Sequence, residues 1–255
     1  MIDMKGRVAA IFGLANKRSI AWAIAQNLHA AGAELAISYQ NDRMKQEAEG
    51  LIADLPGARA FQCDVSSDAE IDQVFAQLKE TYGKLDVLVH SIGFAPAQAL
   101  HNDFVLTSRE DFRIALDVSV YSLIALTRGA TPLMTDGGSV LTLTYFGAEK
   151  VVPHYNVMGV AKAALEATVR YLSADLGKHK IRVNAVSAGP VKTLASRGIG
   201  GLGEMLKSHA ERAPLGRNVE QDEVGKTALF LASDLATAIT GETIYVDCGY
   251  NIMGF

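Results

Sequence analysis

The chain has 255 residues, a formal charge of −4 and a hydrophobic content of 49%. This length and content suffice for one large core, and α/β folds of this size commonly form a single domain. The mildly acidic balance, without a dense basic patch or a long charged tail, argues against nucleic-acid binding.

No apolar run reaches the roughly 18 to 20 residues that a membrane-spanning helix needs. The start of the chain carries Asp3 before a short apolar run, which is not typical of a signal peptide. The two cysteines, Cys63 and Cys248, lie far apart in apolar segments and are expected to be buried free thiols. No Cys/His cluster has the spacing of metal ligands. We therefore expect a soluble, cytoplasmic protein without a metal site.

In chain order, short apolar runs alternate with longer segments of helical periodicity. The runs are predicted as strands over residues 8–12, 34–39, 59–65, 85–93, 139–145, 181–189 and 243–249. They are rich in Val and Ile and almost continuously apolar, which is typical of parallel strands covered on both faces. Between the first two runs, residues 19–32 place Ala21, Ile24, Ala25 and Leu28 on one helical face.

This alternation predicts an α/β fold. We expect one Rossmann-like, doubly wound domain over residues 1–255, with a seven-stranded parallel sheet and helices on both faces. The segment 193–206 breaks the rhythm, because Gly198, Gly200 and Gly203 make it a weak helix. It is either a mobile substrate lid or a plain flexible loop, and composition does not separate the two.

The turn after the first strand is a candidate phosphate site. Gly13 ends the strand, and Ser19 precedes the helix that follows. In a Rossmann fold, this turn and the helix N-terminus bind pyrophosphate, and glycine permits the close approach. Ser19 is a candidate N-cap whose hydroxyl could also reach a phosphate. Only Gly13 of the usual triple-glycine fingerprint is present. The segment could therefore also be an ordinary strand–helix turn that binds no phosphate.

The ends of the second and third strands favour NADH over NADPH. Gln40 lies about where an acidic residue would bind the adenosine ribose, and its amide can bond to hydroxyls. A site for the extra phosphate of NADPH would favour Arg or Lys there, and the nearest are Arg43 and Lys45. Asp64, which Val65 follows, could accept a hydrogen bond from the adenine amino group. Alternatively, it could be the N-cap residue of the next helix.

Tyr155 and Lys162 are seven residues apart in a segment of helical spacing, so their side chains should face the same way. Lysine can stabilise charge near the phenol and bind the ribose of a nicotinamide cofactor. A plain amphipathic helix is the alternative. Tyr145 ends the fifth strand, and open α/β sheets place their active sites at strand ends of this kind. The alternative is that Tyr145 only packs against a neighbouring helix. Thr193, after the sixth strand, could donate to the pyrophosphate or the nicotinamide amide.

Together these motifs resemble the short-chain dehydrogenase/reductase superfamily, and most closely its branch of NADH-dependent enoyl-acyl-carrier-protein reductases of bacterial fatty-acid synthesis. The matching stretches are SIAWAIAQ (19–26), SYQND (38–42), HSIGFAP (90–96), LTYFGAEKVVPHYNVMGVAKAALE (143–166) and SAGPVKTLAS (187–196). Ordinary members have a TGxxxGxG loop and a Tyr four residues before the Lys. Here Met158 stands four residues before Lys162, whereas the enoyl reductases place the Tyr seven residues before it.

The resemblance implies the roles of individual residues. Cofactor contacts are implied for Gly13, Ser19, Ile20, Gln40, Asp64, Val65, Ser91, Ile92, Gly93, Lys162, Val191, Lys192, Thr193, Leu194 and Ala195. The substrate would be bound by Ala95, Tyr145 and Tyr155, and the catalytic residues would be Tyr145, Tyr155 and Lys162.

The implied reaction reduces a trans-2-enoyl thioester, carried by acyl carrier protein, through hydride transfer from NADH. Tyr155 would donate to the enolate oxygen, and Lys162 would hold the nicotinamide ribose. Tyr145 would shape the pocket near the thioester and could assist protonation. The lid segment and the apolar residues Phe94, Ile199 and Met205 would shelter the acyl chain.

The resemblance also implies a homotetramer, which apolar helices over residues 108–134 and 154–176 support. Lys192, Arg197 and Lys207 are candidates for docking the acidic carrier protein, with solvated surface charge as the alternative. Two other functions stay open. One is an ordinary short-chain dehydrogenase acting on a carbonyl or alcohol, and the other is a non-catalytic NAD-binding regulator.

Overall fold

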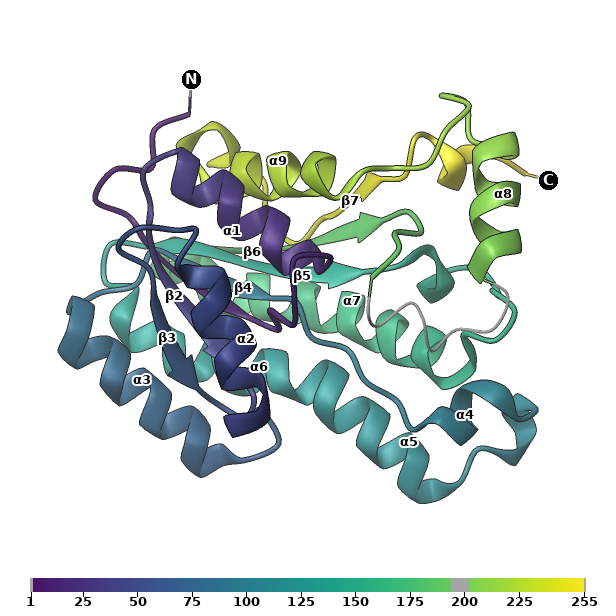
Figure 1. Ribbon diagram of the computed structural model, residues 1–255, viewed down its shortest axis with the longest axis horizontal. Coiled ribbons are helices and arrows are strands. Elements are labelled where there is room, and N and C mark those ends of the chain that lie inside the picture. Colours follow the sequence, from purple (N-terminus) through teal and green to yellow (C-terminus); the bar gives the residue numbers. More distant parts are fainter. Residues whose placement is uncertain (1, 194–201, 255) are drawn as a thin grey trace.

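A parallel β-sheet forms the centre of the molecule. The computed structural model describes residues 2–193 and 202–254. The sheet has seven strands in the order β3-β2-β1-β4-β5-β6-β7 (Figure 1). The strands are β1 Val8–Phe12, β2 Glu34–Tyr39, β3 Arg59–Gln62, β4 Val87–His90, β5 Gly138–Thr144, β6 Ile181–Ala188 and β7 Thr243–Val246. All neighbouring pairs are parallel, so the predicted doubly wound α/β sheet is confirmed.

Helices cover both faces of the sheet. They are α1 Ile20–Ala30, α2 Asp42–Ile52, α3 Asp68–Tyr82, α4 Ala97–His101, α5 Arg109–Leu116, α6 Ser122–Ala130, α7 Asn156–Leu176, α8 Leu202–Arg212 and α9 Gln221–Ala232. α1 and α9 lie side by side on one face, whereas α3, α6 and α7 cover the other (Figure 1). No helix in the described part of the chain is long and apolar enough to cross a membrane.

Burial on both faces explains why the strands are continuous apolar runs. Along β1, Val8, Ala10 and Phe12 belong to the core cluster that contains α3, α6 and α7. Ala9 and Ile11 belong to the cluster that contains α1 and α9. Each residue of β1 therefore packs under a helix, whichever side of the sheet it points to.

Several predicted strands extend too far along the chain. Residues 63–65 follow β3, residues 91–93 follow β4, and residues 247–249 follow β7. The reason is that an apolar run reports burial, and burial and strand pairing need not end at the same residue. Cys63, for example, is buried but lies outside β3.

The segment predicted as one helix over residues 108–134 is interrupted. A π-helical turn, η2 (Asp117–Tyr121), joins α5 to α6. Two hydroxyls hold the turn, because Ser119 Oγ donates to the carbonyl of Phe94 at 3.1 Å and Ser122 Oγ donates to that of Val118 at 2.7 Å. Such turns are frequent at functional sites, and this one lies against the loop that follows β4.

Two helix starts also differ from the sequence-based expectation. α7 begins at Asn156, so Tyr155 is its N-cap residue and lies just before the helix. In the predicted lid, α8 begins at Leu202 although glycine disfavours a helix there. Burial of the apolar Leu206 side chain stabilises α8. The remainder of the lid, residues 194–201, lies outside the described residues.

Candidate active site

The carboxyl ends of the parallel strands meet at one edge of the sheet, where the predicted site residues lie. Gly13 follows β1, Ser91 follows β4 and Tyr145 follows β5. Gly13 has a φ of +96°, and a Cβ there would lie 2.1 Å from the carbonyl oxygen of Ser91. Only glycine fits where these two turns approach each other. The strand order reverses between β1 and β4, and open α/β sheets bind ligands at such a point.

Ser19 is the N-cap residue of α1, as predicted. Its hydroxyl accepts from the backbone N–H of Trp22 at 3.3 Å and donates to the carbonyl of Asn16 at 2.7 Å. Ile20 is the first helical residue, and the preceding Gly13 is exposed. The hydroxyl is thus engaged within the turn, so an anion would be attracted mainly by backbone N–H groups and the helix dipole. Phosphate binding at this turn stays a prediction.

Gln40 and Asp64 are brought together beyond the ends of β2 and β3. The Gln40 amide donates to the Asp64 carboxylate at 3.0 Å, and Ser66 donates to it from both backbone and hydroxyl. Burial alone would raise the pKa of Asp64, but these hydrogen bonds lower it. Asp64 is therefore ionised at neutral pH. The alternative that Asp64 caps the next helix is wrong, because the N-cap of α3 is Ser67.

Lys162 is buried at the centre of this edge. Its ammonium donates to the carbonyl oxygen of Leu143 in β5 at 2.7 Å. A Cβ built on Gly93 would lie 3.4 Å from the same nitrogen, so the loop after β4 passes directly over it. Burial lowers the pKa of Lys162 to about 8, while the Glu166 carboxylate acts to raise it. The ammonium is therefore charged at neutral pH and loses its proton in mildly alkaline solution.

The two tyrosines lie in direct contact. The rings of Tyr145 and Tyr155 meet edge to face, with 5.0 Å between centroids and 72° between planes. Burial raises the pKa of Tyr145 to about 12 and also raises the pKa of Tyr155. Both hydroxyls are therefore protonated at neutral pH and available as donors. The expectation that Lys162 stabilises charge near the phenol stays a prediction.

α8 covers one side of the tyrosine pair. The Tyr145 hydroxyl donates to the thioether sulfur of Met205 at 3.4 Å. Ala95 is half-buried and packs against the small cluster of Ala99 and Val157. The structure thus brings Met205, predicted to shelter the acyl chain, onto the tyrosine expected beside the thioester.

The remaining predicted cofactor residues lie in the loops that follow β3, β4 and β6. Val65, Ile92, Val191 and Thr193 are half-buried, whereas Lys192 is exposed. Leu194 and Ala195 lie outside the described residues, as do Arg197 and Ile199 of the predicted lid. Lys207 is exposed on α8, and its ammonium lies 3.9 Å from the Glu211 carboxylate.

The residues at this edge fit a nicotinamide dinucleotide. The Gly13 turn and the start of α1 present N–H groups, which suit the pyrophosphate. Gln40 and Asp64 present an amide and a carboxylate, which suit the adenosine hydroxyls and amino group. Lys162 presents a buried ammonium, which suits the ribose next to the nicotinamide. The donors and acceptors lie in the order that such a molecule would need across β2, β1, β4 and β5.

Known proteins are similar to this chain over nearly its whole length. The model of the family described as enoyl-(acyl carrier protein) reductase matches residues 13–251. A protein from Synechocystis, named enoyl-(acyl-carrier-protein) reductase (NADH), is 52% identical, with 100% of each chain covered. This chain belongs to the enoyl-(acyl carrier protein) reductase family. The branch predicted from the spacing of its tyrosines and lysine is confirmed.

Solved structures of enoyl-(acyl carrier protein) reductases also match the fold. The Bacillus cereus enzyme with NADP+ and indole naphthyridinone has a TM-score of 0.98 and 48% identity, with 100% of both chains covered. The Anaplasma phagocytophilum enzyme in complex with NAD has a TM-score of 0.96 and 48% identity, with 99% of this chain and 96% of that one covered.

Sequence reasoning missed a buried histidine of the reductase site. The ring nitrogens of His90, the last residue of β4, lie 2.8 Å from the hydroxyls of Thr142 and Ser122. Burial, assisted by the charge of Lys162, lowers the pKa of His90 to about 3. The ring is therefore neutral and ties β4 to β5 and to the first residue of α6. His90 could have been identified from the sequence because it is a polar residue at the end of an apolar strand.

Glu166 was also missed. Its carboxylate accepts a hydrogen bond from the Thr144 hydroxyl at 2.6 Å. Thr144 directly precedes Tyr145 in the sequence. Burial raises the pKa of Glu166, and the Thr144 hydrogen bond opposes this. Glu166 follows Lys162 by four residues on α7, and this one-turn spacing could have identified the pair.

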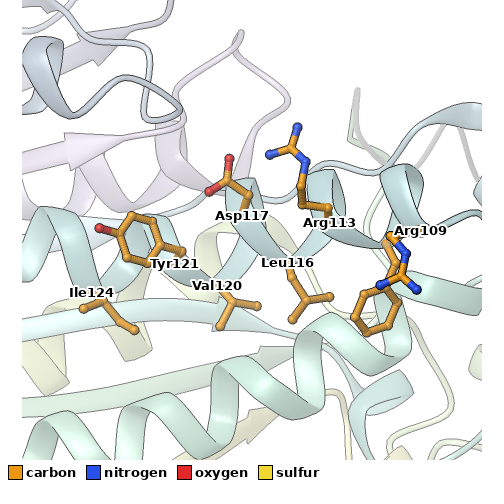
Figure 2. Close-up of a pocket in the computed structure, with 8 residues that line it drawn as sticks. Arg109, Arg113, Leu116, Asp117, Val120, Tyr121 and Ile124 are labelled. Carbon is orange, nitrogen blue, oxygen red and sulfur yellow. The ribbon is translucent and has the colours of Figure 1, made fainter.

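A separate depression lies on the outer surface of α5, η2 and α6 (Figure 2). Its volume is about 610 Å³, and none of the residues that line it, all in the described part of the chain, is a predicted site residue. Phe112, Tyr121 and Ile124 are each more than a third exposed there. The depression is thus an apolar surface feature, distinct from the strand edge that carries the tyrosines.

Proposed function

We propose that this chain reduces trans-2-enoyl thioesters, carried by acyl carrier protein, to saturated acyl thioesters with NADH as hydride donor. The observation that carries the proposal is the buried Tyr145–Tyr155 pair, on the same strand edge as the buried ammonium of Lys162. This edge also holds the Gly13 turn. A relative that matches over the full chain is named as a reductase of this kind.

Tyr155 has the properties of the donor that the reaction needs. NADH, when bound, supplies the hydride that adds to the β-carbon of the enoyl group. Negative charge then grows on the thioester oxygen, and the Tyr155 hydroxyl donates a hydrogen bond to that oxygen. The raised pKa keeps the proton on the phenol beforehand. Donors aimed at developing charge in a dry site are often the largest single contribution to catalysis.

Lys162 orients the cofactor, and Tyr145 shapes the substrate side. One N–H of the ammonium is bound to Leu143, which leaves two for the ribose hydroxyls. Its charge adds positive potential at the strand edge. Tyr145, in contact with Tyr155 and Met205, excludes water from one side of the thioester.

The ends of β2 and β3 support NADH as the cofactor. The Asp64 carboxylate, ionised and bonded to Gln40, would repel the additional phosphate of NADPH while accepting bonds from hydroxyls. The solved Bacillus cereus relative contains NADP+, so the two nucleotides have to be compared directly in this protein.

An assay of NADH oxidation tests the function. A crotonyl thioester should drive oxidation, whereas a ketone should not, and NADPH should support a slower rate. An ordinary short-chain dehydrogenase would show the opposite substrate preference, and a non-catalytic NAD-binding regulator would bind NADH without consuming it. Lys162→Ala should weaken NADH binding and abolish most turnover. Normal turnover in that variant would show that the site lies elsewhere.

The assembly and location belong to the same proposal. The apolar face of α5, η2 and α6 suits a second copy of the chain in a homotetramer, because the same patch on two subunits can pair about a two-fold axis (Figure 2). The carrier protein would dock near Lys192 and the segment 193–206, which we propose as a substrate lid within one domain. Both cysteines are free, as expected, but only Cys63 is buried, whereas Cys248 is half-buried. Free thiols suit a reducing cytoplasm.

A further inference from the structure

α8 carries a buried imidazole, that of His209. His209 is 4% exposed, and neither of its ring nitrogens has a hydrogen-bond partner among the described residues. The carboxamide oxygen of Asn218 is also buried and has no hydrogen-bond partner among the described residues. No hydrogen bond of acceptable geometry therefore joins the side chains of His209 and Asn218. Because an unpaired buried polar group destabilises a fold, packing of the ring has to compensate.

The ring packs between two other segments. It stacks on Tyr250, near the end of the chain, with 4.6 Å between centroids and 21° between planes. A Cβ built on Gly189 would lie 3.0 Å from Nε2, so the turn after β6 also lies against the imidazole. Burial lowers the pKa of His209, against the opposing effect of Asp247. The ring is therefore neutral at pH 7 and packs as aromatic surface.

These contacts also connect α8 to Tyr145. Tyr250 also meets Phe146 edge to face, with 5.8 Å between centroids, and Phe146 directly follows Tyr145. On α8, Met205 lies one turn before His209 and accepts from the Tyr145 hydroxyl. α8 is thus tied to the end of β5 twice, directly through Met205 and indirectly through the aromatic stack. Figure 1 shows α8 beside the C-terminal end of the chain.

We propose that His209 is a positioning residue, whose stacking on Tyr250 fixes α8 so that Met205 stays on the Tyr145 hydroxyl. The inference rests on the proposed function, because it takes Tyr145 to border the substrate. The imidazole acts through the helix. Without the stack, α8 would no longer hold Met205 in place, and the acyl side of the site would open to water. Substrate binding would then weaken more than the hydride step.

Two substitutions of His209 test the stack. His209→Ala removes the ring, and His209→Phe restores aromatic surface without the unpaired nitrogens. We expect His209→Ala to raise KM for a trans-2-dodecenoyl thioester roughly tenfold, the scale of one lost aromatic pair. The kcat and the NADH affinity, measured by fluorescence titration, should change little, and His209→Phe should restore KM. His179→Ala, at an exposed histidine, is the matched control and should leave KM unchanged.

A double-mutant cycle tests whether the effect runs through Met205. Met205→Ala should raise KM by itself, and adding His209→Ala should then have little further effect. Additive effects, or an unchanged KM in His209→Ala, would overturn the inference. If His209→Ala does not fold, Tyr250→Ala removes the same stack from the other side. Normal turnover in Lys162→Ala would refute the proposed site itself, whereas an inactive Lys162→Ala with a normal His209→Ala would refute the positioning role alone.

Discussion

At the scale of single residues, burial decides the protonation of the reacting groups. It raises the pKa of Tyr145 and Tyr155, and it lowers the pKa of Lys162, because a dry site disfavours every charged form. The phenols consequently remain donors throughout the physiological range. The ammonium, with a pKa of about 8, is the one of these three groups that changes charge close to the physiological range.

The first prediction concerns the Tyr155 hydroxyl. Tyr155→Phe removes the proposed donor to the thioester oxygen but keeps the ring that packs on Tyr145. We expect turnover of a crotonyl thioester to fall roughly 100- to 1000-fold, as when one oxyanion donor is lost. Steady-state kinetics measure turnover, and fluorescence titration with NADH measures the affinity for the cofactor. Loss of NADH affinity in this variant would mean that Tyr155 serves the cofactor and that the division of roles is incorrect.

The second prediction concerns the charge of Lys162. Glu166 raises the pKa of this ammonium, so Glu166→Gln should lower it further. Since the charged form predominates only below that pKa, the alkaline loss of NADH affinity should move to lower pH. Titrations with NADH between pH 6 and about 9 would measure the shift. Asp175→Asn, exposed near the other end of α7, is the control and should leave the profile in place.

Some site residues could be predicted from the sequence and others could not, for a physical reason. Tyr155 and Lys162 were proposed from their seven-residue spacing, which is a local pattern, although Tyr155 lies just before α7. The partners of His90 come from 32 and 52 residues away, so no local pattern contains them. The stack of His209 on Tyr250 likewise depends on how the end of the chain folds back.

At the scale of elements, the strands could be predicted because both faces of the sheet are covered. Their ends could not, since hydrophobicity reports burial rather than pairing. The break between α5 and α6 was also missed, because it depends on hydrogen bonds between Ser119 and Phe94, which belong to separate segments.

The third prediction tests the approach of the β1 and β4 turns. Gly13→Ala would place a Cβ 2.1 Å from the Ser91 carbonyl at a φ of +96°. Backbone strain should cost about 1 kcal/mol, and relieving the overlap should cost about 1–3 kcal/mol more of the free energy of unfolding. Gly57→Ala is a matched control, because Gly57 has a φ of +87° but nothing within 4 Å of its Cβ position.

Denaturant unfolding of both glycine variants would separate the two contributions. NADH affinity should fall in Gly13→Ala alone, because its turn would carry the pyrophosphate. Equal stability losses in the two variants would mean that the turns can move apart without cost, which would contradict the required close approach.

At the scale of the whole molecule, the topology could be predicted because alternating strands and helices allow few arrangements. The homotetramer implied by the resemblance stays a prediction, because the assembly depends on which surfaces stay apolar after folding. The face of α5, η2 and α6 is such a surface, because Leu116, Tyr121 and Ile124 line one depression along it. Covering this face with a second copy would bury side chains that are exposed in the single chain.

The fourth prediction tests that assembly. The wild type should have about four times the chain mass of 27.2 kDa in light scattering after gel filtration. A double variant, Phe112→Glu with Ile124→Glu, places two charges on the proposed contact, where burying them unpaired is unfavourable. Its mass should fall to that of one or two chains. Gln73→Glu with Gln77→Glu adds the same charge to exposed positions of α3 and should leave the assembly intact. A tetramer that survives the first pair of substitutions would place the subunit contacts on other faces of the chain.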